Sequence, residues 1–199
     1  MTQADDAALS DYIASSGKAA WEVPDITPAT PRREVRSVGI IGAGTMGGGI
    51  SMNFATAGYN IRIVETTQEA LDRGLSVVRG NYQRSADRGR FPVEEVDIRM
   101  GRYDGRLELA DLADCDMVIE AVFENMDLKK QIFTELDRVM KPGAILATNT
   151  SALDIDEIAS VTSRPEDVIG MHFFSPANVM KLLEIVRAEK TASDVLATS

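Results

Sequence analysis

The sequence predicts an α/β fold in which helices cover both faces of a mostly parallel sheet. Short apolar runs alternate with longer segments of helical periodicity from residue 38 onward. A glycine-rich turn follows the first apolar run and opens the first helix of the series. The chain has 199 residues, 44% of them hydrophobic and 26% charged, which is sufficient for one core of ordinary size.

The first half of the series contains two strands and two helices. Residues 37–41 form an apolar run that is typical of a buried strand, and the turn at 42–49 leads into a helix that continues to residue 57. Residues 60–64 predict the second strand, and residues 69–87 predict a long helix. Residues 89–110 have no clear pattern and receive no assignment.

The second half alternates in the same way. One helix is predicted to be amphipathic, with its apolar face formed by Leu128, Ile132, Leu136 and Val139. A Lys-Pro-Gly sequence at 141–143 ends that helix. The last two strands are close in sequence, so they are expected to pair antiparallel near the C-terminal end. The predicted strands are 117–122, 144–148, 168–174 and 182–186, and the predicted helices are 127–140 and 154–161.

Residues 1–36 differ from residues 37–199, which form the predicted folded domain. Pro24, Pro28 and Pro31 lie among small and polar residues, a composition typical of an extended linker. Before them, residues 6–20 have the spacing of one short helix, but a disordered tail fits this segment equally well.

Composition excludes several classes of partner. The formal net charge of -10 disfavours nucleic acid, and the apolar runs are too short to span a membrane. The single cysteine, Cys115, cannot form an internal disulfide, which favours a reducing, cytoplasmic location. No metal site is predicted, because clusters with metal-ligand spacing are absent.

The glycine-rich turn has the spacing Gly-x-Gly-x-x-Gly, with glycines at Gly42, Gly44 and Gly47. In this pattern the first glycine permits a tight turn, the second lets a pyrophosphate approach the backbone, and the third lets helix and strand pack closely. Glu65 follows the second strand, where a carboxylate accepts hydrogen bonds from ribose hydroxyls and repels a 2′-phosphate. A Rossmann-type sheet that binds NAD in preference to NADP is therefore predicted.

The only histidine, His172, lies in an apolar strand, and Glu184 lies in the apolar strand that follows. If the two strands turn about Asn178, residues whose numbers sum to 356 face each other, which pairs His172 with Glu184. Glu184 is expected to be buried in this apolar strand, where a carboxylate is costly without a partner, and it would fix the imidazole tautomer. This arrangement predicts a base that removes a proton from a hydroxyl group.

Asn149 and Ser151 follow a strand that is predicted to be parallel to the first. They are therefore expected at the carboxyl edge of the sheet, where ligands bind. Both are candidates for hydrogen bonds to substrate or to the nicotinamide ribose. A helix-capping role for Ser151 or Asp154 is an alternative that does not exclude the first.

Four motifs in order resemble the 3-hydroxyacyl-CoA dehydrogenases, over most of the chain. They are Val-Gly-Ile-Ile-Gly-Ala-Gly-Thr-Met-Gly from Val38, Ile-Glu-Ala-Val-Phe-Glu-Asn from Ile119, Ala-Thr-Asn-Thr-Ser from Ala147 and Gly-Met-His-Phe-Phe-Ser-Pro from Gly170. The resemblance implies oxidation of L-3-hydroxyacyl-CoA by NAD in fatty-acid β-oxidation, with His172 as base, Glu184 as its orienting partner and Ser151 near the substrate oxygen. It implies further NAD contacts at Met46, Glu65, Val122, Glu124, Lys129 and Ser175.

The chain also departs from the family pattern. Many members carry Asp at the position of Glu65 and Asn at the position of Ser175. Members continue into a helical C-terminal domain that completes the substrate pocket and forms the homodimer, so residues 37–199 are expected to be an incomplete unit. The proline-rich segment resembles the linker that follows an enoyl-CoA hydratase in multifunctional enzymes.

Two other functions are compatible with these features. One is a dehydrogenase of free 3-hydroxyacids, which relies on a lysine that has no matching motif here. The other is an NAD-binding module that is inactive by itself because the C-terminal domain is missing. The first would turn over free acids, and the second would bind NADH without turnover.

Overall fold

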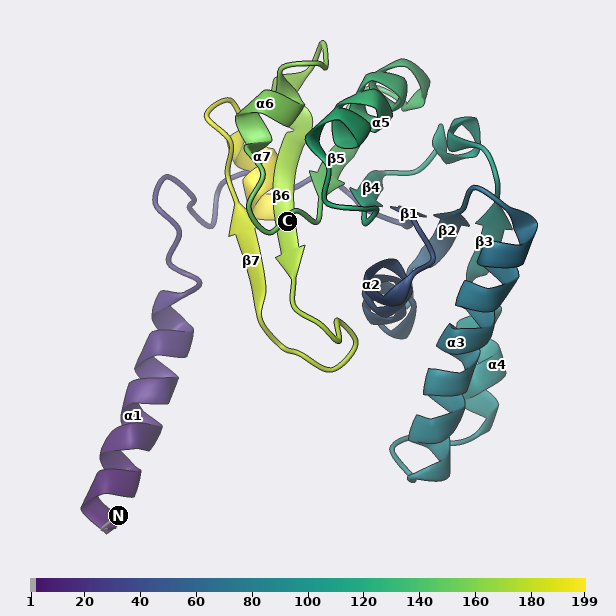
Figure 1. The fold of residues 1–199 in the computed structure, drawn as a ribbon. Helices are drawn as coiled ribbons and strands as arrows, with labels where there is room; N and C mark the ends of the chain where they lie inside the picture. Colours follow the sequence, from purple (N-terminus) through teal and green to yellow (C-terminus); the bar gives the residue numbers. More distant parts are fainter. Residues whose placement is uncertain (1–2) are drawn as a thin grey trace.

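A seven-stranded sheet, with strand order β3-β2-β1-β4-β5-β6-β7, forms the centre of the computed structural model, which describes residues 3–199 (Figure 1). All neighbouring strands are parallel except β6 and β7, which are antiparallel. The strands are β1 (Ser37–Ile41), β2 (Asn60–Val64), β3 (Tyr103–Arg106), β4 (Met117–Glu120), β5 (Ile145–Thr148), β6 (Val168–Phe173) and β7 (Leu183–Val186). The predicted fold class is confirmed.

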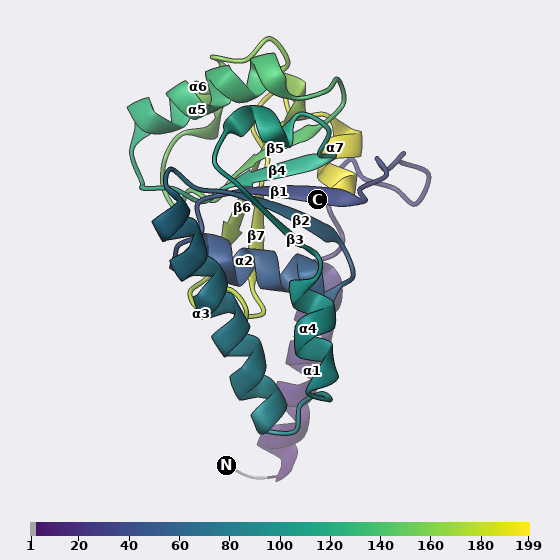
Figure 2. The same ribbon diagram turned by 90° about the vertical axis from the view of Figure 1, so that its right-hand side faces the viewer.

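Helices lie on both faces of this sheet, with α2, α3 and α4 on one side and α5 and α6 on the other (Figure 2). The α-helices are α1 (Gln3–Ala19), α2 (Thr45–Thr56), α3 (Gln68–Asp87), α4 (Glu94–Met100), α5 (Met126–Val139), α6 (Ile155–Ala159) and α7 (Ser193–Thr198). Two 3₁₀ turns, η1 (Leu109–Leu112) and η2 (Pro165–Asp167), complete the described elements.

The order of the strands creates a binding crevice. Strand β1 has β2 on one side and β4 on the other, so the connections that leave β1 and β4 run in opposite directions. Such a switch point opens a crevice at the carboxyl ends of the two strands. Strand β1 is almost entirely buried, as β4 and β5 are, because helices pack on both of their faces.

The segment without an assignment, 89–110, contains α4, β3 and part of η1. Strand β3 has the sequence Tyr-Asp-Gly-Arg and lies at the edge of the sheet, where it pairs with β2 from Ile61 to Val64. An edge strand needs only one buried face, so its sequence does not have the apolar run of a central strand. Helix α7 was also absent from the predicted elements.

Helix α5 is amphipathic, as predicted. Of the four residues on its predicted apolar face, Leu136 is fully buried, and Ile132 and Val139 are partly buried against the core. Leu128 is half-buried and, together with Ile132, lines the crevice beside the sheet. Lys129 and Phe133 are fully buried as well, so the buried face extends beyond the predicted residues.

Cys115 is buried beside the sheet, as expected for a structural cysteine. Burial, with a smaller contribution from the neighbouring carboxylates, raises the pKa of its thiol to about 11. Its reactivity is low because the thiol form persists at neutral pH.

The N-terminal segment forms a helix, α1, that stands away from the sheet (Figure 1). The apolar residues Leu9, Tyr12 and Ile13 of α1 are exposed. The following segment is fastened to the domain by Arg33, whose guanidinium contacts Asp167 at 2.6 Å and Asp194 at 2.8 Å. Among the described residues, no helix combines the length and apolarity that a membrane span requires.

Candidate active site

The glycine turn has the geometry predicted for each of its three glycines. Gly42 has a φ of 96°, a backbone angle that residues other than glycine rarely adopt. A Cβ on Gly47 would lie 1.8 Å from the carbonyl oxygen of Gly42, so helix α2 can pack on β1 only without one. A Cβ on Gly44 would meet no atom within 4 Å, so the backbone there is open to a ligand.

Gly44 is the N-cap of α2 and has no side chain that could accept hydrogen bonds from the first turn. The N–H groups at the start of α2 therefore face the crevice with the positive end of the helix dipole. This combination binds a pyrophosphate, and the open space at Gly44 leaves room for one. The residues present fit the pyrophosphate of a dinucleotide.

A mostly apolar cavity of about 550 Å³ adjoins this turn at the carboxyl ends of β1, β2 and β4. The predicted cofactor-binding residues Gly42, Gly44, Met46, Glu65 and Val122 all line it. The remaining walls are apolar side chains, among them Leu107, Leu109, Phe123, Leu128 and Ile132.

Glu65 connects β2 with the glycine turn. Its carboxylate accepts hydrogen bonds from the backbone N–H of Ala43 at 3.0 Å and of Thr66 at 2.9 Å. A carboxylate has more acceptor positions than these two bonds use. Glu65 can therefore hold the turn and still accept a hydrogen bond from a ligand in the cavity.

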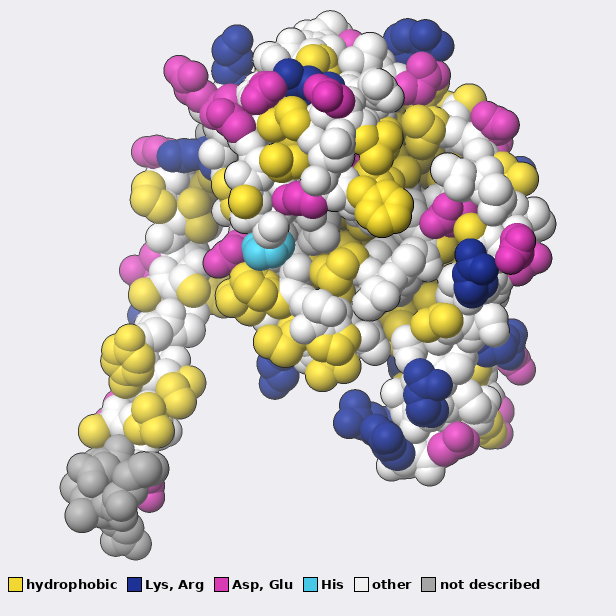
Figure 3. Space-filling view, viewed as in Figure 1, with side chains coloured by type: hydrophobic (Ala, Val, Ile, Leu, Met, Phe, Trp, Pro, Cys, Tyr) yellow, Lys and Arg dark blue, Asp and Glu magenta, His cyan; other side chains and the backbone are white. Residues whose placement is uncertain are grey.

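The His172–Glu184 pair is confirmed as a cross-strand neighbour pair. In the antiparallel ladder of β6 and β7, His172 faces Glu184, and Nδ1 of the imidazole lies 2.9 Å from a carboxylate oxygen. The ring of Phe174 packs on the imidazole with centroids 4.4 Å apart. His172 remains accessible at the surface, beside hydrophobic side chains (Figure 3).

One expectation about this pair is wrong, because the Glu184 side chain is 52% exposed and not buried. Strand β7 is the edge strand of the sheet, and its residues alternate between half-buried and exposed. The pairing of Glu184 with His172 therefore follows from strand register and not from the cost of burying a charge.

Glu124 joins the loop after β4 to the loop after β5. Its carboxylate accepts hydrogen bonds from the hydroxyl of Thr150 at 2.5 Å and from the N–H of Ser151 at 2.9 Å. Burial opposes its ionisation, but these hydrogen bonds and the charge of Lys129 outweigh burial and lower the pKa of Glu124. Ser151 itself is exposed, and its hydroxyl lies 3.3 Å from the same carboxylate. The cap of α6 is Asp154 and not Ser151.

Lys129 is fully buried, and its ammonium contacts Glu120 at 2.7 Å and Glu124 at 3.4 Å. Asn149 accepts a hydrogen bond from the backbone N–H of Phe173 at 2.8 Å, which ties the loop after β5 to the strand that carries His172. Ser175 is exposed in the loop after β6. These candidate residues therefore lie at one edge of the sheet. Glu124, Lys129 and Ser151 form one group there, and His172, Glu184 and Ser175 form the other. Asn149 connects the two groups through its hydrogen bond with Phe173.

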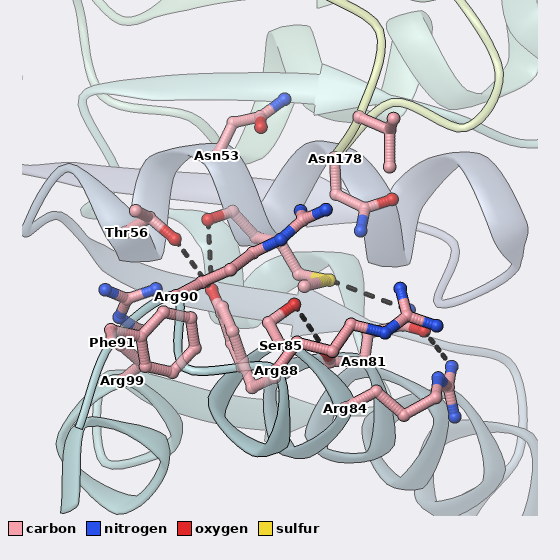
Figure 4. Close-up of a pocket in the computed structure, with 13 residues that line it drawn as sticks. Asn53, Thr56, Asn81, Arg84, Ser85, Arg88, Arg90, Phe91, Arg99 and Asn178 are labelled. Carbon is pink, nitrogen blue, oxygen red and sulfur yellow. Dashed lines mark hydrogen bonds between the residues drawn. The ribbon is translucent and has the colours of Figure 1, made fainter. Parts of the chain in front are cut away.

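Two features were not predicted from the sequence. The first is Glu120, at the end of β4, although a carboxylate in a fully buried strand is unusual. The second is an arginine-rich cavity of about 490 Å³ between the C-terminal part of α2, the end of α3, α4 and the loop after β6 (Figure 4). Its basic lining residues are Arg84, Arg88, Arg90 and Arg99.

This arginine cavity gives local positive charge to a chain whose net charge is -10. Arg99 is held over the ring of Phe91, with 3.9 Å from the guanidinium carbon to the ring centroid. Asn178, from the loop between β6 and β7, lines the opposite wall. The density of arginines between residues 84 and 99 was the available signal in the sequence.

A family model described as "3-hydroxyacyl-CoA dehydrogenase, NAD binding domain" matches residues 37–199. The chain is 47% identical over 167 residues to the peroxisomal bifunctional enzyme of Danio rerio, covering 84% of this chain and 23% of that protein. It is 42% identical over 168 residues to a probable 3-hydroxybutyryl-CoA dehydrogenase of Bacillus subtilis, covering 82% of this chain and 58% of that protein.

The fold is similar to that of a solved 3-hydroxybutyryl-CoA dehydrogenase from Escherichia coli, with a TM-score of 0.81 and 36% identity. That match covers 83% of this chain and 35% of the other. The chain thus spans a part of each of these relatives.

Proposed function

Because the chain belongs to the 3-hydroxyacyl-CoA dehydrogenase family, we propose that it binds NAD in the crevice and takes part in the oxidation of L-3-hydroxyacyl-CoA to 3-ketoacyl-CoA. The observation that supports this most is the contact of 2.9 Å between His172 and Glu184, at the sheet edge that also carries the glycine turn. NAD supplies the hydride acceptor when it is bound, and the side chains supply binding, orientation and proton transfer.

His172 is the proposed base. Its Nδ1 faces Glu184, so Nε2 is the nitrogen that accepts the proton of the substrate hydroxyl. The carboxylate of Glu184 fixes that orientation and balances the charge of the protonated ring. Ser151 is proposed to hydrogen-bond the substrate oxygen, with its loop held by Glu124.

The cofactor contacts divide between the two ends of the crevice. Glu65 and the glycine turn are proposed to hold the adenosine and pyrophosphate part. The residues proposed for the nicotinamide end are Val122, Glu124, Asn149, Ser151 and Ser175. Lys129, which was expected to contact NAD, has no exposed surface and is proposed to act there only by holding Glu124.

NADH is expected to bind at least tenfold more tightly than NADPH. The carboxylate of Glu65 accepts hydrogen bonds from ribose hydroxyls but repels a 2′-phosphate at that position. Fluorescence titration of the chain with each nucleotide measures the ratio, and Glu65→Gln should reduce it. Equal affinity for the two nucleotides would show that Glu65 does not face the ribose.

The arginine cavity is proposed to bind the phosphates of CoA. Arginine pairs with phosphate through charge-assisted hydrogen bonds, and a strongly acidic chain needs such a local site for an anionic substrate. The cavity is bounded by Asn178 of the loop that joins β6, which carries His172, to β7.

Arg88→Gln is expected to raise KM for acetoacetyl-CoA roughly five- to tenfold with little change in kcat, because a partly exposed charge pair contributes to binding and not to the reaction. The assay uses a fusion enzyme in which this chain is followed by the unmatched C-terminal part of the B. subtilis relative. Arg73→Gln on the same helix is the control, since Arg73 pairs with Glu69 away from the cavity. An unchanged KM would place CoA elsewhere.

The same assay separates the proposed function from its two alternatives. A dehydrogenase of free acids would oxidise NADH with acetoacetate as readily as with acetoacetyl-CoA. A binding module would bind NADH but show no turnover with either substrate, even in the fusion enzyme. We expect turnover with acetoacetyl-CoA only.

The context of the domain is also a proposal. An enoyl-CoA hydratase upstream of residue 37 agrees with the name of the D. rerio relative, a bifunctional enzyme. Homodimer formation through a C-terminal helical domain stays a prediction. So does the cytoplasmic location, and the names of several relatives place those proteins in peroxisomes.

A further inference from the structure

A completely buried ion pair lies beneath the candidate nicotinamide end of the crevice. Glu120 ends β4, Lys129 lies in α5, and both side chains have 0% exposure. Burying two charges costs free energy that a hydrophobic pair would not cost, so a buried ion pair is weak evidence for stability. Its use has to be sought in what the charges hold in place.

Both carboxylate oxygens of Glu120 accept hydrogen bonds. Both oxygens contact the ammonium of Lys129, at 2.7 and 2.8 Å. One oxygen also accepts the N–H of Val122 at 2.8 Å, and the other accepts the hydroxyl of Thr148 at 2.7 Å. Glu120 therefore fixes the loop after β4 and the end of β5 together with Lys129.

Lys129 links the buried Glu120 to residues at the surface of the crevice. Its ammonium lies 3.4 Å from a carboxylate oxygen of Glu124, whose other oxygen accepts hydrogen bonds from Thr150 and Ser151. A continuous chain of contacts thus runs from the buried Glu120 to the exposed Ser151. Glu120 itself, with no exposed surface, cannot touch a cofactor or substrate.

We propose that Glu120 is a positioning residue for the nicotinamide end of NAD: it holds Lys129, and Lys129 holds Glu124 and the Ser151 loop in the binding geometry. This role rests on the proposed function. In this proposal the crevice has two ends. Glu65 and the glycine turn bind the adenosine end of NAD, and the residues positioned through Glu120 bind the nicotinamide end.

The test compares the binding of NADH with that of ADP, which lacks the nicotinamide ring and its ribose. Glu120→Gln keeps the size of the side chain but removes its charge, so Lys129 and Glu124 lose their fixed positions. NADH affinity should fall roughly tenfold or more, the effect of losing hydrogen bonds between charged groups. ADP affinity should change less than about twofold, because the turn and Glu65 are untouched. Calorimetry with each ligand on the 199-residue chain gives both values.

A second variant covers the case in which Glu120→Gln fails to fold. Thr148→Val replaces a fully buried hydroxyl that donates to Glu120, with a side chain of similar shape that suits a strand. It should lower NADH affinity about threefold and leave ADP affinity unchanged. Lys130→Met is the matched control, because Lys130 is the next residue on α5 and pairs with Glu157 at the surface. It should change neither affinity.

The two affinities together separate a positioning role for Glu120 from a purely structural one. A similar fall in both affinities would mean that Glu120 supports the fold alone, and no fall in either would mean that the ion pair is dispensable. Both results overturn the positioning role. If the unchanged chain bound neither NADH nor ADP, the proposed function itself would be wrong.

Discussion

Turnover of 3-hydroxyacyl-CoA by the fusion enzyme is expected to fall by roughly 100-fold to 10,000-fold when His172 is replaced by glutamine. Glutamine keeps the approximate size and hydrogen bonding of the side chain but cannot take up the proton of the substrate hydroxyl. NADH affinity should stay almost unchanged, because the cofactor is proposed to bind through other residues. Initial rates and NADH titrations of the two proteins provide the comparison.

Glu184→Gln should also lower turnover, since a neutral amide holds the imidazole but does not balance its positive charge. The double variant should lose much less activity than the product of the two single losses, because the two side chains act as one unit at 2.9 Å. Fully additive losses would contradict a shared role. If His172→Gln retained normal turnover, His172 would be an ordinary residue of strand β6.

A second large effect is expected at the glycine turn. Gly44→Val should weaken NADH binding on the order of 100-fold, the equivalent of losing one or two hydrogen bonds to a charged group. The added side chain would extend into the open space where the pyrophosphate is proposed to lie. No protein atom lies within 4 Å of the new Cβ, so the melting temperature should change little.

Substitutions at two other glycines provide comparisons for this experiment. Gly17 in α1 also has open space around it and is remote from the crevice, so Gly17→Val should leave NADH affinity unchanged. A Cβ at Gly47 would lie 1.8 Å from a backbone oxygen, so Gly47→Ala should prevent normal packing of α2. Retained NADH affinity in folded Gly44→Val protein would mean that the turn does not face the cofactor.

The register of the strands that carry His172 and Glu184 could be predicted because it depends on counting residues. Apolar residues flank His172 and Glu184, and a short connection leaves one alignment in which those residues form a ladder. The three glycines were predictable for a similar reason, since each has a steric role that only glycine can meet.

Other parts could not be predicted because their roles depend on tertiary contacts. Periodicity indicated the apolar face of α5, but it did not show that Leu128 and Ile132 also line the crevice or that Lys129 is fully buried beside them. The arginine cavity joins residues of α2, α3 and α4 with the loop after β6, so its shape exists only in the folded chain. The same is true of Glu120 and Lys129, nine residues apart in sequence.

The transfer of hydrogen itself tests the central proposal most directly. NADH carrying deuterium at C4 of the nicotinamide ring is incubated with acetoacetyl-CoA and the fusion enzyme, and the product is analysed by mass spectrometry. The account predicts deuterium at C3 of 3-hydroxybutyryl-CoA, and its loss in the His172→Gln variant. Binding of NADH without transfer of deuterium to the thioester, or equal transfer to free acetoacetate, would contradict it.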